Sequence, residues 1–357
     1  MDEAQSVDTD WAFFVFALGY FLAIWLDIND SPKTLGSVMC SQLRLDVFTK
    51  RPMLARLQQI ISIALMLFMA GAWYYFGSHA PVVALLISIS PVALYALVLC
   101  AEFHFSARSH LQIDLPVSSL VWWRVWASEL FTGPAIFCWR QPFRTNSEAD
   151  NLASDLQQGR RGVVLVHGLF CNRAFWAPWM KVLRRDQRCF MAVNLEPVFG
   201  SIECYAGQIS TAVATVAAAT GRPVLVVCHS MGGLAARAWL TKAGDQAPIH
   251  RIVTIATPHH GTWLARFGYS ANAREMRLAS TWLTHLNNAS TPELNRKFVC
   301  WYSDTDNIVF PSVNACLPGA DNRLVRGQAH VCLAFAPVVV TQTLALLDEP
   351  SHVTVTA

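Results

Sequence analysis

One serine of the chain stands where a hydroxyl group can act as a nucleophile. Ser230 follows the apolar run 224–228 and His229, and Gly232 and Gly233 come directly after it. A serine between small residues at a sharp strand-to-helix turn has an exposed hydroxyl, because the small neighbours let strand and helix approach closely. The alternative is a serine that only caps a helix N-terminus. The two glycines favour a nucleophile for acyl transfer.

Such a nucleophile needs a histidine that takes its proton. His330 follows the short apolar run 324–325 and precedes an apolar helical stretch. His259 and His260 instead follow an earlier predicted strand. We therefore predict that His330 is the base and that His259 lines the site.

The base needs a carboxylate that orients it, and two candidates follow the predicted strand 298–302. These are Asp304 and Asp306. Either could instead be an aspartate that binds its own backbone in a turn. The spacing of the two residues leaves both open.

The oxyanion of an acyl-transfer intermediate needs two preorganised N–H donors. One is expected from Met231, the residue after the nucleophile. The other is expected from the loop after the apolar run 163–166, with Leu169 as the first choice and Phe170 as its rival.

The elements that must position these groups alternate between strand and helix from residue 162 onward. The predicted strands are 163–166, 189–195, 224–228, 251–256, 298–302 and 324–325, and the predicted helices are 203–219, 231–243 and 333–347. Continuous apolar strands separated by helices indicate a doubly wound, mostly parallel sheet covered on both faces. In such sheets functional groups gather at the carboxyl ends of the strands, which is where every candidate above lies.

Residues 162–347 resemble the α/β-hydrolases, in particular the compact bacterial lipases and esterases. The resemblance rests on the stretches 167–170, 229–233, 306–309 and 327–330, and on the turn 257–262. It departs from the family at Cys228, which stands where the G-x-S-x-G pattern has its first glycine. In the family the catalytic aspartate precedes an x-Ile-Val step, so the resemblance implies Asp306 rather than Asp304.

The resemblance implies a serine hydrolase that cleaves a carboxylic ester, expected to be a lipid ester, with no metal or organic cofactor. The predicted substrate-binding residues are Phe170, His229, His259 and Trp282. An acyltransferase or thioesterase with the same triad is the alternative among enzymes. A non-catalytic membrane scaffold on the same fold is the alternative outside them.

The composition places part of the chain in lipid. Of the 357 residues 54% are hydrophobic and only 14% are charged, whereas soluble domains have about 25% charged residues. This excludes a disordered chain and a nucleic-acid-binding domain dominated by basic residues. The net charge of +3 is too small to name an anionic partner, and the ten cysteines form no metal-binding spacing.

Residues 1–144 are predicted to form a membrane region. The stretch 57–101 contains no Asp, Glu, Lys or Arg, and one span needs about 20 apolar residues, so we predict transmembrane helices at 57–77 and 80–101. The stretch 11–26 is a candidate short span. The tryptophan-rich stretch 116–140 is a candidate interfacial helix, with an ordinary packing helix as the alternative. A linker over 145–161 leads into the hydrolase domain 162–357.

Positively charged residues predict the orientation of this integral membrane protein. They flank the predicted hairpin and are absent from its turn; they are Lys33, Arg44, Lys50, Arg51 and Arg56 before it and Arg108 and Arg124 after it. Because such residues stay on the cytoplasmic side, the hydrolase domain is expected there. The oligomeric state is left open.

The segment 258–297 is far longer than the usual connection of 2–6 residues in α/β units, and we expect it to form a cap. An amphipathic helix with an apolar side for an acyl chain is predicted from the spacing of Met276, Trp282, Leu283 and Leu286. The alternative is that these residues simply pack the segment onto the sheet.

Overall fold

The computed structural model describes residues 52–110, 117–152 and 159–349. The predicted span 11–26 lies outside these residues. The described chain divides into two compact units. One contains Ala64–Glu102, and the other contains Pro52–Ile63 together with the chain from Phe103 onward. The second unit therefore includes helical residues that precede the predicted start of the hydrolase domain at 162.

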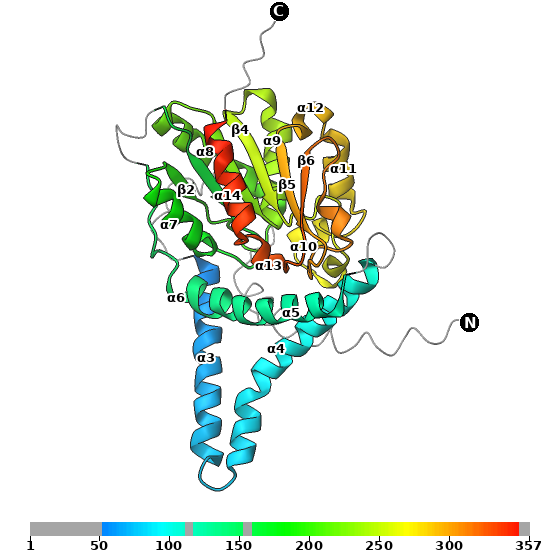
Figure 1. The fold of residues 1–357 in the computed structure, drawn as a ribbon. Coiled ribbons are helices and arrows are strands. Elements are labelled where there is room, and N and C mark those ends of the chain that lie inside the picture. The colour runs from blue at the N-terminus through cyan, green and yellow to red at the C-terminus, as the bar shows by residue number, and fades with distance from the viewer. Residues whose placement is uncertain (1–51, 111–116, 153–158, 350–357) are drawn as a thin grey trace, which may run out of the picture. The chain divides into compact units, whose positions relative to one another are not determined.

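Two long helices, α3 (Met53–Phe76) and α4 (Pro81–His110), form a hairpin (Figure 1). Both are long and apolar enough to cross a membrane. Large apolar side chains are exposed all around them within 64–102, among them Leu67, Trp73, Tyr74, Leu86 and Leu97. A helix that is apolar on every side is suited to lipid rather than to water. A third apolar stretch, His330–Asp348, also meets the length and hydropathy criteria, but half of it is buried in the second unit.

The second unit is built on a six-stranded sheet with the order β2-β1-β3-β4-β5-β6. Its strands are β1 (Val163–Val166), β2 (Phe190–Ala192), β3 (Val224–His229), β4 (Ile249–Ile255), β5 (Phe298–Ser303) and β6 (Asp321–Val325). All five neighbouring pairs are parallel. The prediction of a doubly wound α/β-hydrolase sheet preceded by apolar helices is confirmed.

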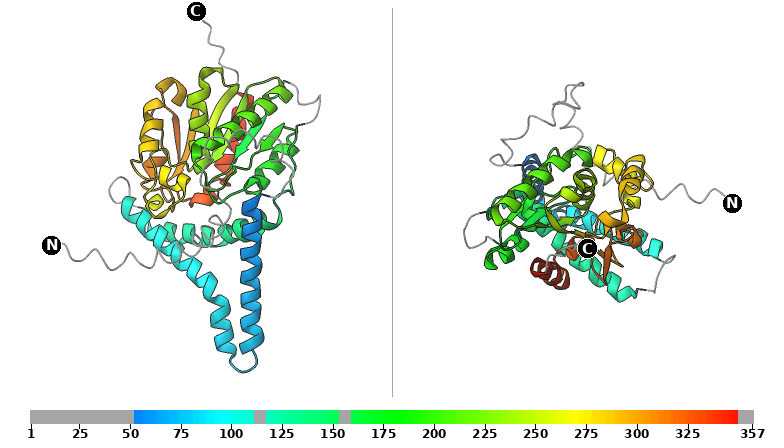
Figure 2. Two further views of the ribbon diagram at one scale, coloured as in Figure 1. Left: turned by 180° about the vertical axis from the view of Figure 1, so that it is seen from behind. Right: turned by 90° about the horizontal axis from the view of Figure 1, so that it is seen from above.

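Helices cover both faces of this sheet, as Figures 1 and 2 show from several sides. In β1, Val164 and Val166 pack with α8 (Ala206–Thr220) and α9 (Met231–Ala243). Val163 and Leu165 point to the other face and pack with α7 (Ala177–Arg185) and α14 (Pro337–Ala345). Both faces are apolar because successive side chains of a strand point to opposite sides.

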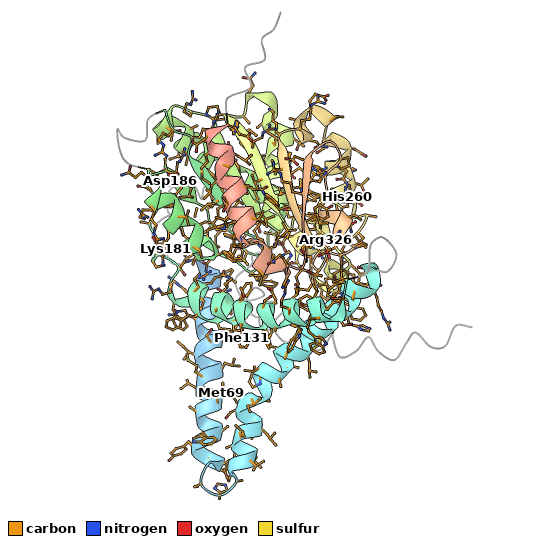
Figure 3. The ribbon with its side chains drawn as sticks, in the orientation of Figure 1. Met69, Phe131, Lys181, Asp186, His260 and Arg326 are labelled. Carbon is orange, nitrogen blue, oxygen red and sulfur yellow. The ribbon has the colours of Figure 1, made fainter. Side chains whose placement is uncertain are left out.

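The tryptophan-rich stretch forms α5 (Ser119–Pro134), which continues into the π-helical turn η1 (Ala135–Arg140) and α6 (Gln141–Phe143). One side of α5 is buried in the second unit and carries Val125, Glu129 and Gly133. The opposite side exposes large apolar residues, namely Leu120, Trp123 and Phe131. Figure 3 labels Phe131 on this exposed side.

Several sequence-based predictions of strands and helices differ from the structure. Strand β2 covers only three residues of the predicted run 189–195, and the predicted helix 203–219 is a short 3-10 turn, Ile202–Tyr205, followed by α8. Strand β6 begins at Asp321, three residues before the predicted run, because it lies at the edge of the sheet, where polar side chains reach water. The single helix predicted over 333–347 is two helices, α13 (His330–Leu333) and α14. Pro337 lacks the N–H that a continuous helix would use, so it starts the second helix.

The amphipathic helix predicted in segment 258–297 is correct for Trp282, Leu283 and Leu286, which share the helix Thr281–Ala289, and wrong for Met276. The segment holds four short helices: η6 (Trp263–Phe267), α10 (Ala271–Glu275), α11 (Thr281–Ala289) and α12 (Pro292–Asn295). Met276 ends α10 and therefore does not share a helix with the other three residues. Met276, Leu283 and Leu286 are buried in the core beside α9, with Trp282 packed against them. The apolar spacing of these four residues therefore reflects their packing against the core of the second unit.

The remaining short helices lie in connections between these elements. They are η3 (Arg173–Trp176), η4 (Ile202–Tyr205), η5 (Gly244–Gln246), η7 (Ser312–Ala315) and η8 (Leu346–Asp348).

Candidate active site

Ser230 lies in a strained turn between the central strand β3 and helix α9. Its backbone has φ 53° and ψ −128°, and its side chain makes no capping hydrogen bond to α9. A positive φ costs a non-glycine residue about 1–3 kcal/mol and persists only where neighbours hold it. Here the Ser230 N–H donates to the Ile255 carbonyl at 2.9 Å, and the Ser230 carbonyl accepts from the Thr257 hydroxyl at 2.8 Å.

Glycines let the neighbouring loops approach this turn. A Cβ on Gly168 would lie 2.8 Å from the Ser230 Cβ, and a Cβ on Gly232 would lie 2.5 Å from the His167 carbonyl oxygen. Cys228, which replaces the first glycine of the family pattern, is fully buried within β3. The close approach therefore depends on Gly168 and Gly232, and the cysteine is accommodated.

The loop after β1 forms a tight turn beside Ser230. The Cys171 N–H donates to the Gly168 carbonyl at 3.3 Å, and Phe170 has φ 57°. The backbone N–H groups of Leu169 and Met231 have no hydrogen-bond partner among the described residues. Both are therefore available to bind an oxyanion, as Leu169 and Met231 were expected to do.

His167 stabilises this turn, a role that the sequence analysis missed. Its Nε2 accepts from the Leu195 N–H at 3.1 Å, so its Nδ1 carries the proton and donates to the Gly168 carbonyl at 2.9 Å. Complete burial lowers the pKa of His167 to about 4, against an ordinary value of 6.5. The imidazole is therefore neutral near pH 7 and acts through its hydrogen bonds.

The predicted base meets one of the two candidate carboxylates. The His330 Nδ1 lies 3.0 Å from both carboxylate oxygens of Asp306. Asp306 is 3% exposed, and its Oδ1 also accepts from the N–H groups of Ile308 and Val309, both at 2.8 Å. The His330 N–H donates to Asn307 Oδ1 at 3.1 Å. One short loop after β5 thus holds both the ring and the backbone of His330.

Asp304 has a different contact. Its Oδ1 accepts from the Gly327 N–H at 2.8 Å, three residues before His330. Asp304 therefore anchors the loop that carries the histidine, while Asp306 binds the histidine ring. The geometry separates the two aspartates where spacing did not.

His229 connects the Ser230 turn to the His330 loop. The two imidazole rings lie 4.8 Å apart, and the His229 Nε2 donates to the His330 carbonyl at 3.3 Å. The other face of His229 stacks on Phe175 at 4.5 Å. Burial, and next the nearby His330, lower the pKa of His229 well below its ordinary value. His229 is thus a neutral support beside the site.

The other predicted substrate-binding residues are placed differently. Phe170 lies in the turn beside Ser230, with its ring 5.8 Å from that of Phe199. The fully buried His259 contacts the Thr254 hydroxyl at 3.1 Å, and Trp282 donates to Glu203 at 3.2 Å. In the described part of the chain, neither His259 nor Trp282 forms a hydrogen bond with Ser230, Asp306 or His330. The substrate-binding roles predicted for His259 and Trp282 stay predictions.

Within residues 52–110, 117–152 and 159–349, no group of three or more His, Cys, Asp or Glu side chains could hold a metal ion.

Comparisons with known proteins agree with this fold. A family model described as "Alpha/beta hydrolase family" matches residues 163–353. No curated protein sequence matches the chain.

Several solved structures of distant sequence are similar to part of the chain. The mature form of a Bacillus licheniformis lipase is 16% identical, with a TM-score of 0.47 over 53% of this chain and 92% of its own. Aspergillus fumigatus lipase B is 16% identical, with a TM-score of 0.47 over 54% of each chain. A Bacillus subtilis carboxylesterase is 14% identical, with a TM-score of 0.34 over 53% of this chain and 84% of its own.

Proposed function

The chain belongs to the alpha/beta hydrolase family, and on that premise we propose that it is a membrane-anchored serine hydrolase that cleaves carboxylic esters through an acyl-enzyme. The observation that carries the proposal is the pairing of His330 with Asp306 at 3.0 Å, on a loop whose His330 carbonyl accepts a hydrogen bond from His229, the residue before the strained Ser230. A nucleophile, a base and a group that orients the base are the three parts that acyl transfer needs.

In the first half of the proposed reaction, the Ser230 hydroxyl attacks the ester carbonyl carbon while the His330 Nε2 takes its proton. Asp306 accepts the hydrogen bond from Nδ1 and stabilises the imidazolium that forms. The N–H groups of Leu169 and Met231 bind the oxyanion of the tetrahedral intermediate. His330 then gives its proton to the leaving alcohol, and the acyl group stays on Ser230.

In the second half, water attacks the acyl-enzyme and His330 acts as base again. The same two N–H groups bind the second oxyanion, and collapse of this intermediate releases the carboxylic acid and restores Ser230. No step needs a metal ion or an organic cofactor.

The membrane part of the proposal rests on the apolar hairpin. Helices α3 and α4 have the length and hydropathy of membrane spans. Large apolar side chains are exposed along residues 64–102 of these helices. Arg56, Arg108 and Arg124 flank the hairpin, and the turn between the helices has no Lys or Arg. We place both flanks, and with them the hydrolase unit, on the cytoplasmic side.

A lipid ester is the substrate class that fits this arrangement. The exposed apolar side of α5, with Leu120, Trp123 and Phe131, suits the lipid–water interface, where tryptophan is enriched. A hydrolase held at a bilayer in this way meets its substrate in the membrane, whereas a short water-soluble ester gives no reason for an anchor.

The test measures ester hydrolysis by the full chain in detergent micelles, with esters of graded acyl length in soluble and micellar form. The variants are Ser230→Ala and, as a matched control, Ser147→Ala at an exposed serine. We expect hydrolysis by the parent and the control, none by Ser230→Ala, and the highest rate on micellar long-chain esters. Hydrolysis by Ser230→Ala at the parent rate would reject the serine mechanism. A maximum on short soluble esters would reject the lipid substrate alone.

A further inference from the structure

Three helices of the N-terminal region each donate or accept a hydrogen bond at a different loop of the candidate active site. On α3, the Gln58 Nε2 donates to the Phe170 carbonyl at 3.0 Å, in the turn beside Ser230. On α4, the Ser106 hydroxyl donates to the backbone carbonyl of Asp306 at 2.6 Å. The third contact, from α5, is to the loop of the predicted base.

Glu129 on α5 makes this third contact. One carboxyl oxygen accepts from the Val331 N–H at 3.4 Å, and the other lies 3.2 Å from the Cys332 sulfur. Both partners follow His330 directly in the sequence. Each of the three contacts thus reaches a different part of the candidate site. These parts are the turn at Phe170, called the oxyanion turn below, the loop that carries Asp306, and the loop that carries His330.

All three contacts lie within one compact unit, because Pro52–Ile63 and the chain from Phe103 onward belong with the sheet. The start of α3 is packed into this unit, with Leu54 and Ala55 at 3% and 2% exposed. Near the end of α4, the Phe105 ring lies 5.0 Å from that of Trp263. The hydrogen bonds are therefore supported by apolar packing.

We propose that Gln58, Ser106 and Glu129 are positioning residues that hold the oxyanion turn, Asp306 and the His330 loop in their catalytic arrangement. The ends of the N-terminal helices are then part of the catalytic unit and more than an anchor. This inference rests on the proposed function, since it assigns roles relative to the same reaction.

Glu129 is the strongest of the three because a carboxyl group is rarely buried without a specific partner. It is 3% exposed, and burial raises its pKa above the ordinary value. Helix α5 also lies close to the His330 loop at Gly327. A Cβ added to this glycine would lie 3.3 Å from the side chains of Arg124 and Val121, which are both on α5. Helix α5 thus holds this loop on both sides of His330.

Ser106 acts on the backbone of the acid itself. Its hydroxyl is buried and bonds the carbonyl of Asp306, whose side chain orients His330. A shift of about 1 Å in a catalytic group can lower the rate about 100-fold. Loss of this hydrogen bond would allow such a shift of Asp306, although every reacting group would still be present.

The test separates a positioning role from a general structural one by measuring kcat and KM for a soluble short-chain ester, with the full chain in detergent. The variants are Gln58→Leu, Ser106→Ala and Glu129→Ala, and the matched controls on the same helices are Gln59→Leu, Ser90→Ala and Ser119→Ala. We expect the first three to lower kcat by about 10- to 100-fold with KM within about twofold. The controls should keep kcat within about twofold of the parent.

Rescue by the conservative variant guards against unfolding. Glu129→Gln keeps an oxygen that accepts from Val331 and should retain most of the parent kcat, whereas Glu129→Ala should not. Ser106→Ala removes a single oxygen and is expected to fold. Parent-like kcat in both Ser106→Ala and Glu129→Ala, or a folded but inactive Glu129→Gln, would overturn the inference.

These outcomes differ from failure of the proposed function. If the parent hydrolyses no ester, or if Ser230→Ala hydrolyses it equally well, the function itself is refuted. If the parent is active, Ser230→Ala is inactive and the positioning variants match the controls, only the inference about the helices is refuted.

Discussion

Replacing Asp306 by asparagine tests the assignment of the orienting acid with little change in shape. The Asp306 Oδ1 accepts from the N–H groups of Ile308 and Val309, both at 2.8 Å. An asparagine carbonyl oxygen can keep both bonds, so the loop after β5 should remain folded. The amide nitrogen then takes the place of Oδ2, which lies 3.0 Å from the His330 Nδ1.

The size of the effect follows from the tautomer of His330. An amide N–H facing Nδ1 donates to that nitrogen and moves the ring proton to Nε2. Because Nε2 must accept the proton of Ser230, the ring can no longer act as the base. For serine proteases the corresponding change lowers kcat by about 10⁴-fold, which is about 5 kcal/mol of transition-state stabilisation. We expect a loss of about 10³- to 10⁴-fold here.

The matched control is Asp304→Asn on the same loop. Its Oδ1 accepts from the Gly327 N–H, and asparagine can keep that bond. We expect kcat within about threefold of the parent, since a surface-loop change away from the reacting groups costs little. The assay is ester hydrolysis by the detergent-solubilised full chain, with melting temperatures to verify folding. A larger loss in Asp304→Asn than in Asp306→Asn would refute the assignment.

Three further predictions concern the turn, acid stability and topology. Gly168→Ala should lower kcat/KM at least about tenfold, because its methyl group would lie 2.8 Å from the Ser230 Cβ; an unchanged value in the ester assay would contradict the close approach. Burial holds the pKa of His167 at about 4, so its contribution to stability is complete above about pH 6.5 and falls as the pH drops toward 4, by about 2 kcal/mol at pH 5. Unfolding in detergent should show this acid loss, reduced in His167→Gln, and an equal slope in both proteins would contradict it. A reporter fused after residue 150 should be active only as a cytoplasmic reporter, and activity on the opposite side would reverse the proposed orientation.

The sheet was predictable because its strands are buried on both faces. The runs that became β1, β3 and β5 are almost continuously apolar, whereas β4 is apolar mainly in its buried second half, Ile252–Ile255. The positions of these four strands agree with the prediction to within a few residues. Strand β6 was harder to predict, since its first three residues are polar at an exposed edge. In segment 258–297 the apolar spacing could not show what the apolar side contacts. Periodicity alone does not distinguish a side that binds an acyl chain from a side that packs against the core.

Residues of the candidate site were predictable where a local pattern marks them. The strand-to-helix turn of Ser230 and the late position of His330 are local signals. The distinction between Asp304 and Asp306 needed either the family resemblance or the structure, since both follow the same strand. Contacts such as that of Ser106 with Asp306 join residues 200 positions apart. No local pattern records such a contact, so the supporting residues were missed.

The nucleophile is tested most directly by covalent labelling of the full chain with a fluorophosphonate, followed by peptide mapping by mass spectrometry. We expect one adduct, on Ser230, which is absent in Ser230→Ala and forms much more slowly in His330→Ala. An adduct on another residue, or the absence of any adduct in a chain that hydrolyses esters, would contradict this expectation.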